Sequence, residues 1–113
     1  MTAKNLLSTT PPYPVEQAIR HFGANLRTAR LRRNLTIKEV AEKIGTGPRV
    51  VMDAEKGKPS TGIVAYAALL WAYDLLGPVS ELADPRRDEE GLALELSSGR
   101  IRARATEELD SDF

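Results

Sequence analysis

The chain has 113 residues, with 16 basic and 16 acidic side chains, one histidine and no cysteine. This length suits one small domain with a modest hydrophobic core, and the lack of cysteine excludes disulfides and thiolate chemistry. The longest apolar run, residues 63–73, is too short to cross a bilayer, and residues 1–14 lack the sustained apolar stretch of a signal peptide. We therefore expect a cytoplasmic protein that does not enter a membrane.

The formal net charge is zero, but the charges are segregated along the chain. Residues 1–60 carry 11 basic and 5 acidic side chains, a balance of +6, so the remaining residues carry −6. A basic front half and an acidic back half indicate two surfaces with different partners, although ordinary solvated helix faces would give the same pattern.

Residues 1–14 contain three prolines and a Ser-Thr-Thr cluster, and we predict a disordered arm there. Apolar residues then recur at helical spacing and predict one long helix to about Arg33. Its apolar side is formed by Val15, Ile19, Phe22, Leu26 and Ala29. Asn34 suits the left-handed conformation that ends a helix.

Thr36 predicts the start of a second helix, because Thr36 and Glu39 have the spacing of a capping box. Val40, Ala41 and Ile44 would face inward, and Gly45 would end this helix. A third helix follows at once. Its cap would be Thr46 or Gly47, and Pro48 fits the first helical position, where no N–H is needed.

In the third helix Val51 and Ala54 would point inward, and Gly57 would end it. Gly-Thr-Gly-Pro is then a compact hinge between two short, steeply crossing helices. That is the layout of a helix-turn-helix.

A fourth helix is predicted over residues 60–76, and residues 78–84 predict a short fifth helix after the break at Gly77-Pro78. The expected inner stripe of the fourth helix is Ile63, Tyr66, Ala67, Leu70, Trp71 and Asp74. We expect Trp71 and Tyr73 to pack in the core or between two copies of the chain, rather than to form a cofactor site.

From residue 85 the chain becomes acidic. "LALEL" alternates with a period of two and could turn through "SSG" into "RIRAR", so a hairpin, a strand added to a partner and a helical extension all remain open. Residues 105–113 predict a mobile acidic tail. The expected organisation is an arm (1–14), an all-α five-helix domain (15–84) and an acidic extension (85–113) that adds at most a short strand.

In a helix-turn-helix, the first residues of the second motif helix reach base edges in the major groove. Arg49, directly after Pro48, suits a bidentate contact to guanine, Asp53 can accept a hydrogen bond from cytosine, and Val50 or Met52 can touch a thymine methyl group. Phosphate contacts are expected from Lys38, Lys56 and Lys58 and from the free amides at the helix starts. The predicted DNA-binding set also includes Thr46, Gly47 and Pro48, where the third helix begins. The alternative is that Arg49 and Asp53 form an ordinary i,i+4 ion pair on a solvated face.

Catalysis requires converging titratable groups, and this chain offers a single histidine, His21, and carboxylates in solvated runs. We therefore expect neither an enzyme nor a metal or cofactor site.

From Phe22 to about Leu76 the sequence resembles the Xre-type helix-turn-helix family of phage repressors and bacterial antitoxins. The matching stretch is "LRTARLRRNLTIKEVAEKIGTGPRVVMDAEKGKPS". The resemblance implies a lambda-repressor-like fold in which Arg30 and Glu55 form a buried structural pair. Ile37 stands where this family usually has glutamine, Gly47 replaces a serine or threonine cap, and Asp53 replaces a polar or basic residue.

"LLWAYDLLGPVSELADPRRDEEGLALE", residues 69–95, resembles the region that follows the DNA-binding domain in HipB-like antitoxins. The resemblance implies a nucleoid-associated homodimer that represses its own operon by binding double-stranded operator DNA and neutralises a HipA-like serine/threonine kinase toxin. The alternative is a protein-interaction adapter, in which the same scaffold survives with weak or no DNA binding.

Overall fold

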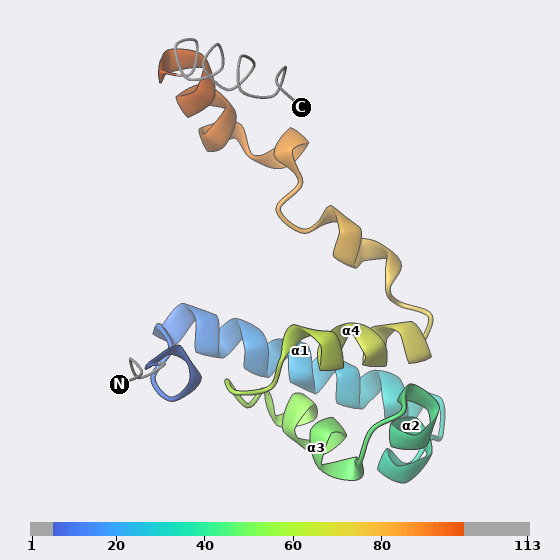
Figure 1. Cartoon of the computed structure of the whole chain (residues 1–113). Helices are drawn as coiled ribbons and strands as arrows, with labels where there is room; N and C mark the ends of the chain where they lie inside the picture. Colours follow the sequence, from blue (N-terminus) through green and yellow to red (C-terminus); the bar gives the residue numbers. More distant parts are fainter. Residues whose placement is uncertain (1–5, 99–113) are drawn as a thin grey trace, which may run out of the picture. The chain divides into compact units, whose positions relative to one another are not determined.

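The computed structural model describes residues 6–98, and every regular element in that range is helical. The α-helices are α1 (Tyr13–Arg32), α2 (Ile37–Ile44), α3 (Pro48–Lys56) and α4 (Ile63–Ala72), joined by the 3-10 helices η1 (Leu6–Ser8), η2 (Gly77–Glu81) and η3 (Pro85–Arg87). A further helix covers residues 89–98. The expected all-α class is confirmed for this part of the chain (Figure 1).

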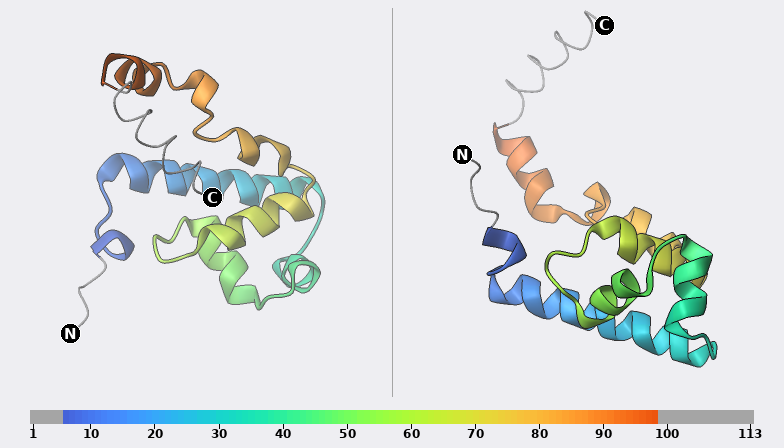
Figure 2. Two further views of the ribbon diagram at one scale, coloured as in Figure 1. Left: turned by 45° about the horizontal axis from the view of Figure 1, so that its top comes forward. Right: turned by 60° about the horizontal axis from the view of Figure 1, so that its bottom comes forward.

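The chain divides into two compact units, Met1–Val79 and Ser80–Phe113, five residues before the boundary expected from sequence. In the first unit α1 packs against α3 and α4, and α2 packs against the same two helices (Figure 2). The core of this unit consists of Leu26, Ala29, Val40, Ala41, Val51, Ala54, Tyr66, Leu69, Ala72 and Tyr73.

The predicted start and end of α2 are confirmed. The backbone N–H of Glu39 donates to Thr36 Oγ1 at 3.0 Å, and the N–H of Thr36 donates to Glu39 Oε1 at 2.9 Å. These hydrogen bonds favour the ionised carboxylate and hold the pKa of Glu39 below its ordinary value. Gly45 ends the helix with a φ of +80°, and Asn34, at +55°, has the left-handed conformation expected after the first helix.

The chain does not run as a continuous rod from α2 into α3. Gly47 is the N-cap of α3 and Pro48 its first residue, as expected, while Gly57 ends the helix with a φ of +67°. Gly47 supplies no side-chain cap, so the first amides of α3 gain no side-chain partner from it.

At the other end of the unit, α1 begins at Tyr13, two residues earlier than predicted, because Pro12 and Pro14 are compatible with a helix start. The expected arm, 1–14, also contains η1. Residues 1–5 lie outside the described residues.

The prediction for α4 was wrong in its limits and partly wrong in its inner stripe, of which Tyr66 is buried and Leu70 packs against the core. The helix begins after Gly62 and ends before Tyr73, and Asp74 has a φ of +60°. Tyr66, Leu69 and Ala72 are the buried residues of α4, whereas Ile63 and Trp71 are 64% and 57% exposed. The sequence IVAYAALLWA is apolar on every side, so its pattern does not indicate which side of the helix is buried. Only packing against the other helices decides that.

Two basic side chains close the C-terminal end of α4. Arg33 Nη2 donates to the carbonyl of Tyr73 at 3.0 Å, and Lys43 Nζ donates to the carbonyl of Ala72 at 3.2 Å. Cations are favourable at the last carbonyls of a helix, which have no partner within it. Arg33 also lies over the Tyr73 ring, 5.6 Å from its centroid.

The expected short fifth helix, residues 78–84, is the 3-10 helix η2, Gly77–Glu81. Residues 89–98 are helical, so among the three alternatives for "LALEL" the strand is wrong and the helical extension is found. Leucine, alanine and glutamate are strong helix formers, and Asp88 Oδ1 accepts from the Gly91 N–H at 3.0 Å, as an N-cap does. "RIRAR" and the acidic tail lie outside the described residues.

Candidate nucleic-acid interface

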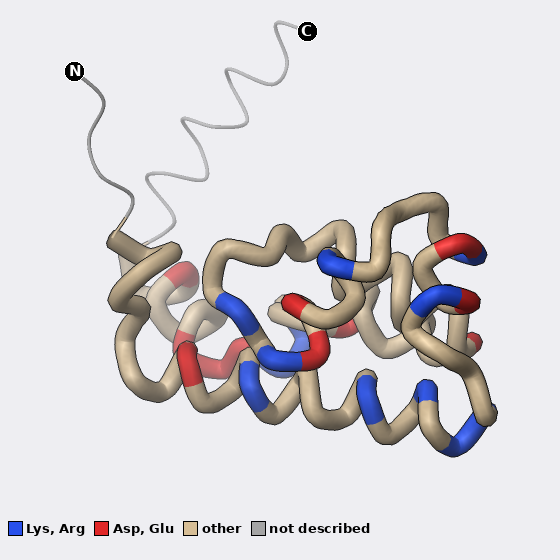
Figure 3. Tube along the Cα trace, turned by 90° about the horizontal axis from the view of Figure 1, so that it is seen from below, with Lys and Arg blue, Asp and Glu red and all other residues tan. Residues whose placement is uncertain are grey.

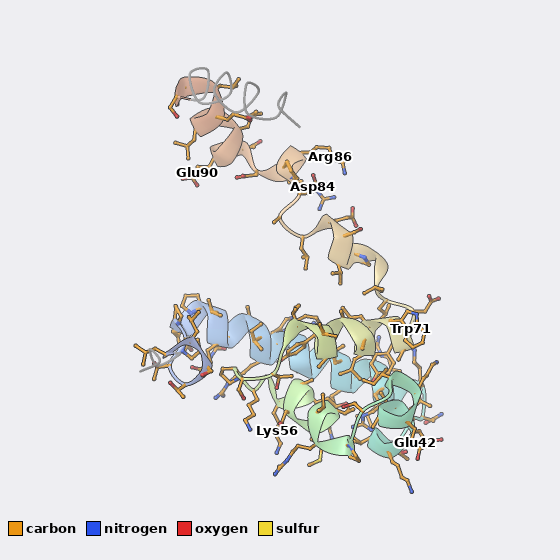
Figure 4. All side chains as sticks on the ribbon, in the orientation of Figure 1. Glu42, Lys56, Trp71, Asp84, Arg86 and Glu90 are labelled. Carbon is orange, nitrogen blue, oxygen red and sulfur yellow. The ribbon has the colours of Figure 1, made fainter. Side chains whose placement is uncertain are left out.

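The outer side of α3 carries most of the residues proposed to contact DNA. Its three prominent side chains, Arg49, Met52 and Lys56, are exposed, whereas Val50 and Asp53 are half-buried between this side and the core. Lys56 projects away from the helix in Figure 4. Of the residues outside or at the start of α3, Lys38, Gly47, Pro48 and Lys58 are exposed and Thr46 is half-buried.

Arg49 is the second residue of α3 and is exposed to solvent. Among the ion pairs of residues 6–98 none includes Arg49. It lies beside the first amides of the helix, where the helix dipole favours anions. A guanidinium in this position can reach a phosphate or a guanine edge.

Asp53 does not pair with Arg49 in the described part of the chain. Its Oδ2 lies 3.8 Å from Lys58 Nζ, beyond the end of α3, and its side chain is 20% exposed. The pairing turns the carboxylate toward the end of the helix and offsets part of the repulsion that it would exert on a nearby phosphate.

The Arg30–Glu55 pair expected from the family resemblance is present. Arg30 Nε donates to Glu55 Oε2 at 2.7 Å and Nη2 donates to Oε1 at 3.0 Å, while Nη1 donates to the Leu35 carbonyl at 3.0 Å. The hydrogen bonds to Glu55 raise the pKa of Arg30 against the opposing effect of burial. This pair joins α1 to the end of α3 and fixes the helix that carries Arg49.

The structure sorts the basic residues of the front half into two groups. Arg30, Arg33 and Lys43 bind carbonyls or a carboxylate within the domain. Arg33 and Lys43 are exposed despite these contacts, as are Arg20, Arg27, Arg32, Lys38, Arg49, Lys56 and Lys58. Figure 3 shows Lys and Arg recurring along α1, and again near the end of α3 with Asp and Glu among them.

Arg20 is a candidate that the sequence analysis missed. Its backbone lies against the end of α3: a Cβ on Gly57 would be 2.6 Å from Arg20 Cα. Gly23 meets the carbonyls of Ala54 and Glu55 in the same way. The two glycines therefore let α1 and α3 approach backbone to backbone, which places Arg20 beside Lys56 and Lys58.

Ile37, where the resembling family usually has glutamine, is half-buried and packs against the core. An apolar side chain at this position therefore has a structural reason. No group of His, Asp and Glu within residues 6–98 is arranged to hold a metal ion.

Among the helices of residues 6–98, none combines the length and apolar character needed to span a bilayer. Comparison of the sequence and structure with protein-family models, curated proteins and solved structures found no match.

Proposed function

We propose that this protein is a dimeric, sequence-specific repressor that binds double-stranded operator DNA through α3. The observation that carries the proposal is the exposed Arg49 at the start of a separate short helix that is anchored from inside by the Arg30–Glu55 pair. Exposed lysines accompany Arg49: Lys56 is the last residue of α3, Lys58 follows it, and Lys38 lies on α2. Such an arrangement supports a base contact surrounded by phosphate contacts.

Dimerisation belongs to the proposal because a helix-turn-helix reads one half-site per copy. Two copies related by a twofold axis would present their α3 helices about 34 Å apart to a palindromic operator. A role as the antitoxin of a HipA-like serine/threonine kinase completes the proposal, and it rests on the resemblance of residues 69–95 to HipB-like antitoxins.

Fluorescence anisotropy with the protein's own promoter fragment tests the DNA-binding part. Affinity should fall steeply as salt rises. Arg49→Ala should relax the preference at one base pair, while Lys58→Ala should weaken binding to all duplexes and lower the salt slope by about one. Binding that is neither salt-dependent nor sequence-selective would refute the proposal.

The second candidate is a protein-interaction adapter, and the surface of α4 favours it. Val64 is 77% and Trp71 is 57% exposed, although α4 contains no charged residue. Figure 4 labels Trp71 near the end of α4. Exposed apolar side chains of this size commonly mark a protein contact. Size-exclusion chromatography with the neighbouring gene product, with and without operator DNA, separates the candidates, since an adapter would bind only the protein.

A further inference from the structure

A hollow of about 470 Å³ lies between the first half of α1 and the end of α3. Four basic side chains line it, from Arg20, Arg49, Lys56 and Lys58, together with the carboxylates of Glu16 and Asp53. Four cations and two anions leave an excess of two positive charges around one concave site. Such a site favours an anion.

The two carboxylates leave part of this positive charge available. Glu16 Oε1 lies 3.1 Å from Arg20 Nη2, and Asp53 pairs with Lys58 at the longer distance of 3.8 Å. Neither Arg49 nor Lys56 takes part in an ion pair among residues 6–98. The side chains of Arg20 and Lys58 are 62% and 55% exposed, so both can turn toward a ligand.

The position of Arg20 is fixed by the backbone rather than by a loop. Gly57 ends α3 in the left-handed conformation, and a side chain there would meet both Arg20 Cα and the carbonyl of Ile19, the latter at 2.8 Å. This contact holds the Arg20 backbone against the end of α3, so Arg20 lines the hollow from α1 and Lys58 lines it from the residues after Gly57.

We propose that this hollow is a phosphate site, in which Arg20 joins Lys56 and Lys58 to hold a backbone phosphate of the duplex read by α3. The inference rests on the proposed DNA binding and adds α1 to the interface. Phosphate is the anion that fits, since the hollow opens beside the helix that carries Arg49, and phosphates line both edges of the groove that such a helix enters.

The test compares Arg20→Gln with Arg27→Gln, an exposed arginine on the same helix that does not line the hollow. Anisotropy with operator duplex is measured over a range of salt. Losing one phosphate contact should lower the salt slope by about 0.9, which is about an eightfold loss of affinity at 0.1 M salt relative to 1 M. Arg27→Gln should change the slope by much less.

Glu16→Gln provides the opposite change, because it removes a carboxylate from the hollow and releases Arg20. It should strengthen binding severalfold. Methylphosphonate substitution of single phosphates in the duplex then locates the contact: at one position the substitution should weaken the wild type more than it weakens Arg20→Gln, in which only the two lysines still contact that phosphate.

Two failures are distinguishable. If the wild type binds duplex DNA in a salt-dependent way but Arg20→Gln behaves as Arg27→Gln does, the phosphate site is refuted and the proposed function stands. If the wild type shows no salt-dependent binding to any duplex, the proposed function fails and the phosphate site fails with it. Thermal unfolding of each variant confirms that the fold is unchanged.

Discussion

The buried pair between Arg30 and Glu55 gives the sharpest test of how α3 is held. Their side chains are 9% and 6% exposed, and two hydrogen bonds join them. Glu55→Leu leaves the Arg30 cation inside the domain with the Leu35 carbonyl as its remaining acceptor. Removing one partner of such a pair costs about 3–5 kcal/mol, because an uncompensated charge stays buried.

The unit Met1–Val79 has an expected stability of about 4–12 kcal/mol at roughly 0.05–0.15 kcal/mol per residue. Losing about 3–5 kcal/mol would therefore remove a large share of the stability of this unit. At about 4–8 °C per kcal/mol, the melting temperature should fall by at least about 12 °C. Arg30→Met should behave similarly, whereas the double variant, with an apolar pair in place of the ions, should recover most of the lost stability.

Urea unfolding followed by circular dichroism at 222 nm measures each variant, with Glu16→Leu as the control. Glu16 and Arg20 also form an ion pair, but it is solvent-exposed and contributes about 1 kcal/mol or less. A Glu55→Leu variant within about 1 kcal/mol of the wild type would show that the pair does not anchor α3.

Three further predictions concern the backbone and one buried phenol. Gly45→Ala should lower the free energy of unfolding by about 1–2 kcal/mol, because its φ is left-handed and nothing lies near the new Cβ. Gly57→Ala should lose about 1–3 kcal/mol more, because its Cβ would also clash with Arg20. Equal losses of stability in urea titrations would contradict the close contact between α1 and α3. Thr36→Ala should cost about 1 kcal/mol by the same measurement, and no loss would argue against the capping box. Burial raises the pKa of Tyr73 to about 12, above the value of about 10 expected in the unfolded chain. The neutral phenol therefore contributes to the stability of the fold fully below pH 10, and this stability is lost as the pH rises toward 12. Guanidinium unfolding measures the stability at pH 8 and at pH 11. Between these two values Tyr73→Phe should lose less stability than the wild type does.

Residues near each helix end were sufficient to predict where the helices around the candidate site begin and end. Thr36 with Glu39, Gly45, Pro48 and Gly57 each act on neighbouring backbone groups, so their effect is decided within a few residues. The same holds for the inward direction of Val51 and Ala54 and the outward direction of Arg49, because a short amphipathic helix has one apolar side.

The buried stripe of α4 was a different case. With apolar residues at every position, no periodicity marks a buried side, and the other helices selected Tyr66, Leu69 and Ala72. For residues 92–96, alternation with a period of two left a hairpin, an added strand and a helical extension open, and the helix propensity of the residues and the cap at Asp88 decided the outcome.

By itself, then, the sequence determined where α2 and α3 begin and end and which side of α3 faces solvent, since these depend on hydrogen bonds and side-chain spacing over a few residues. Tertiary structure alone decided what each cation contacts: Arg33 and Lys43 donate to carbonyls at the end of α4, while Arg20 is brought to α3 by two glycines. Charge counts along a chain cannot distinguish these fates, because they depend on contacts between residues that lie 29–40 positions apart.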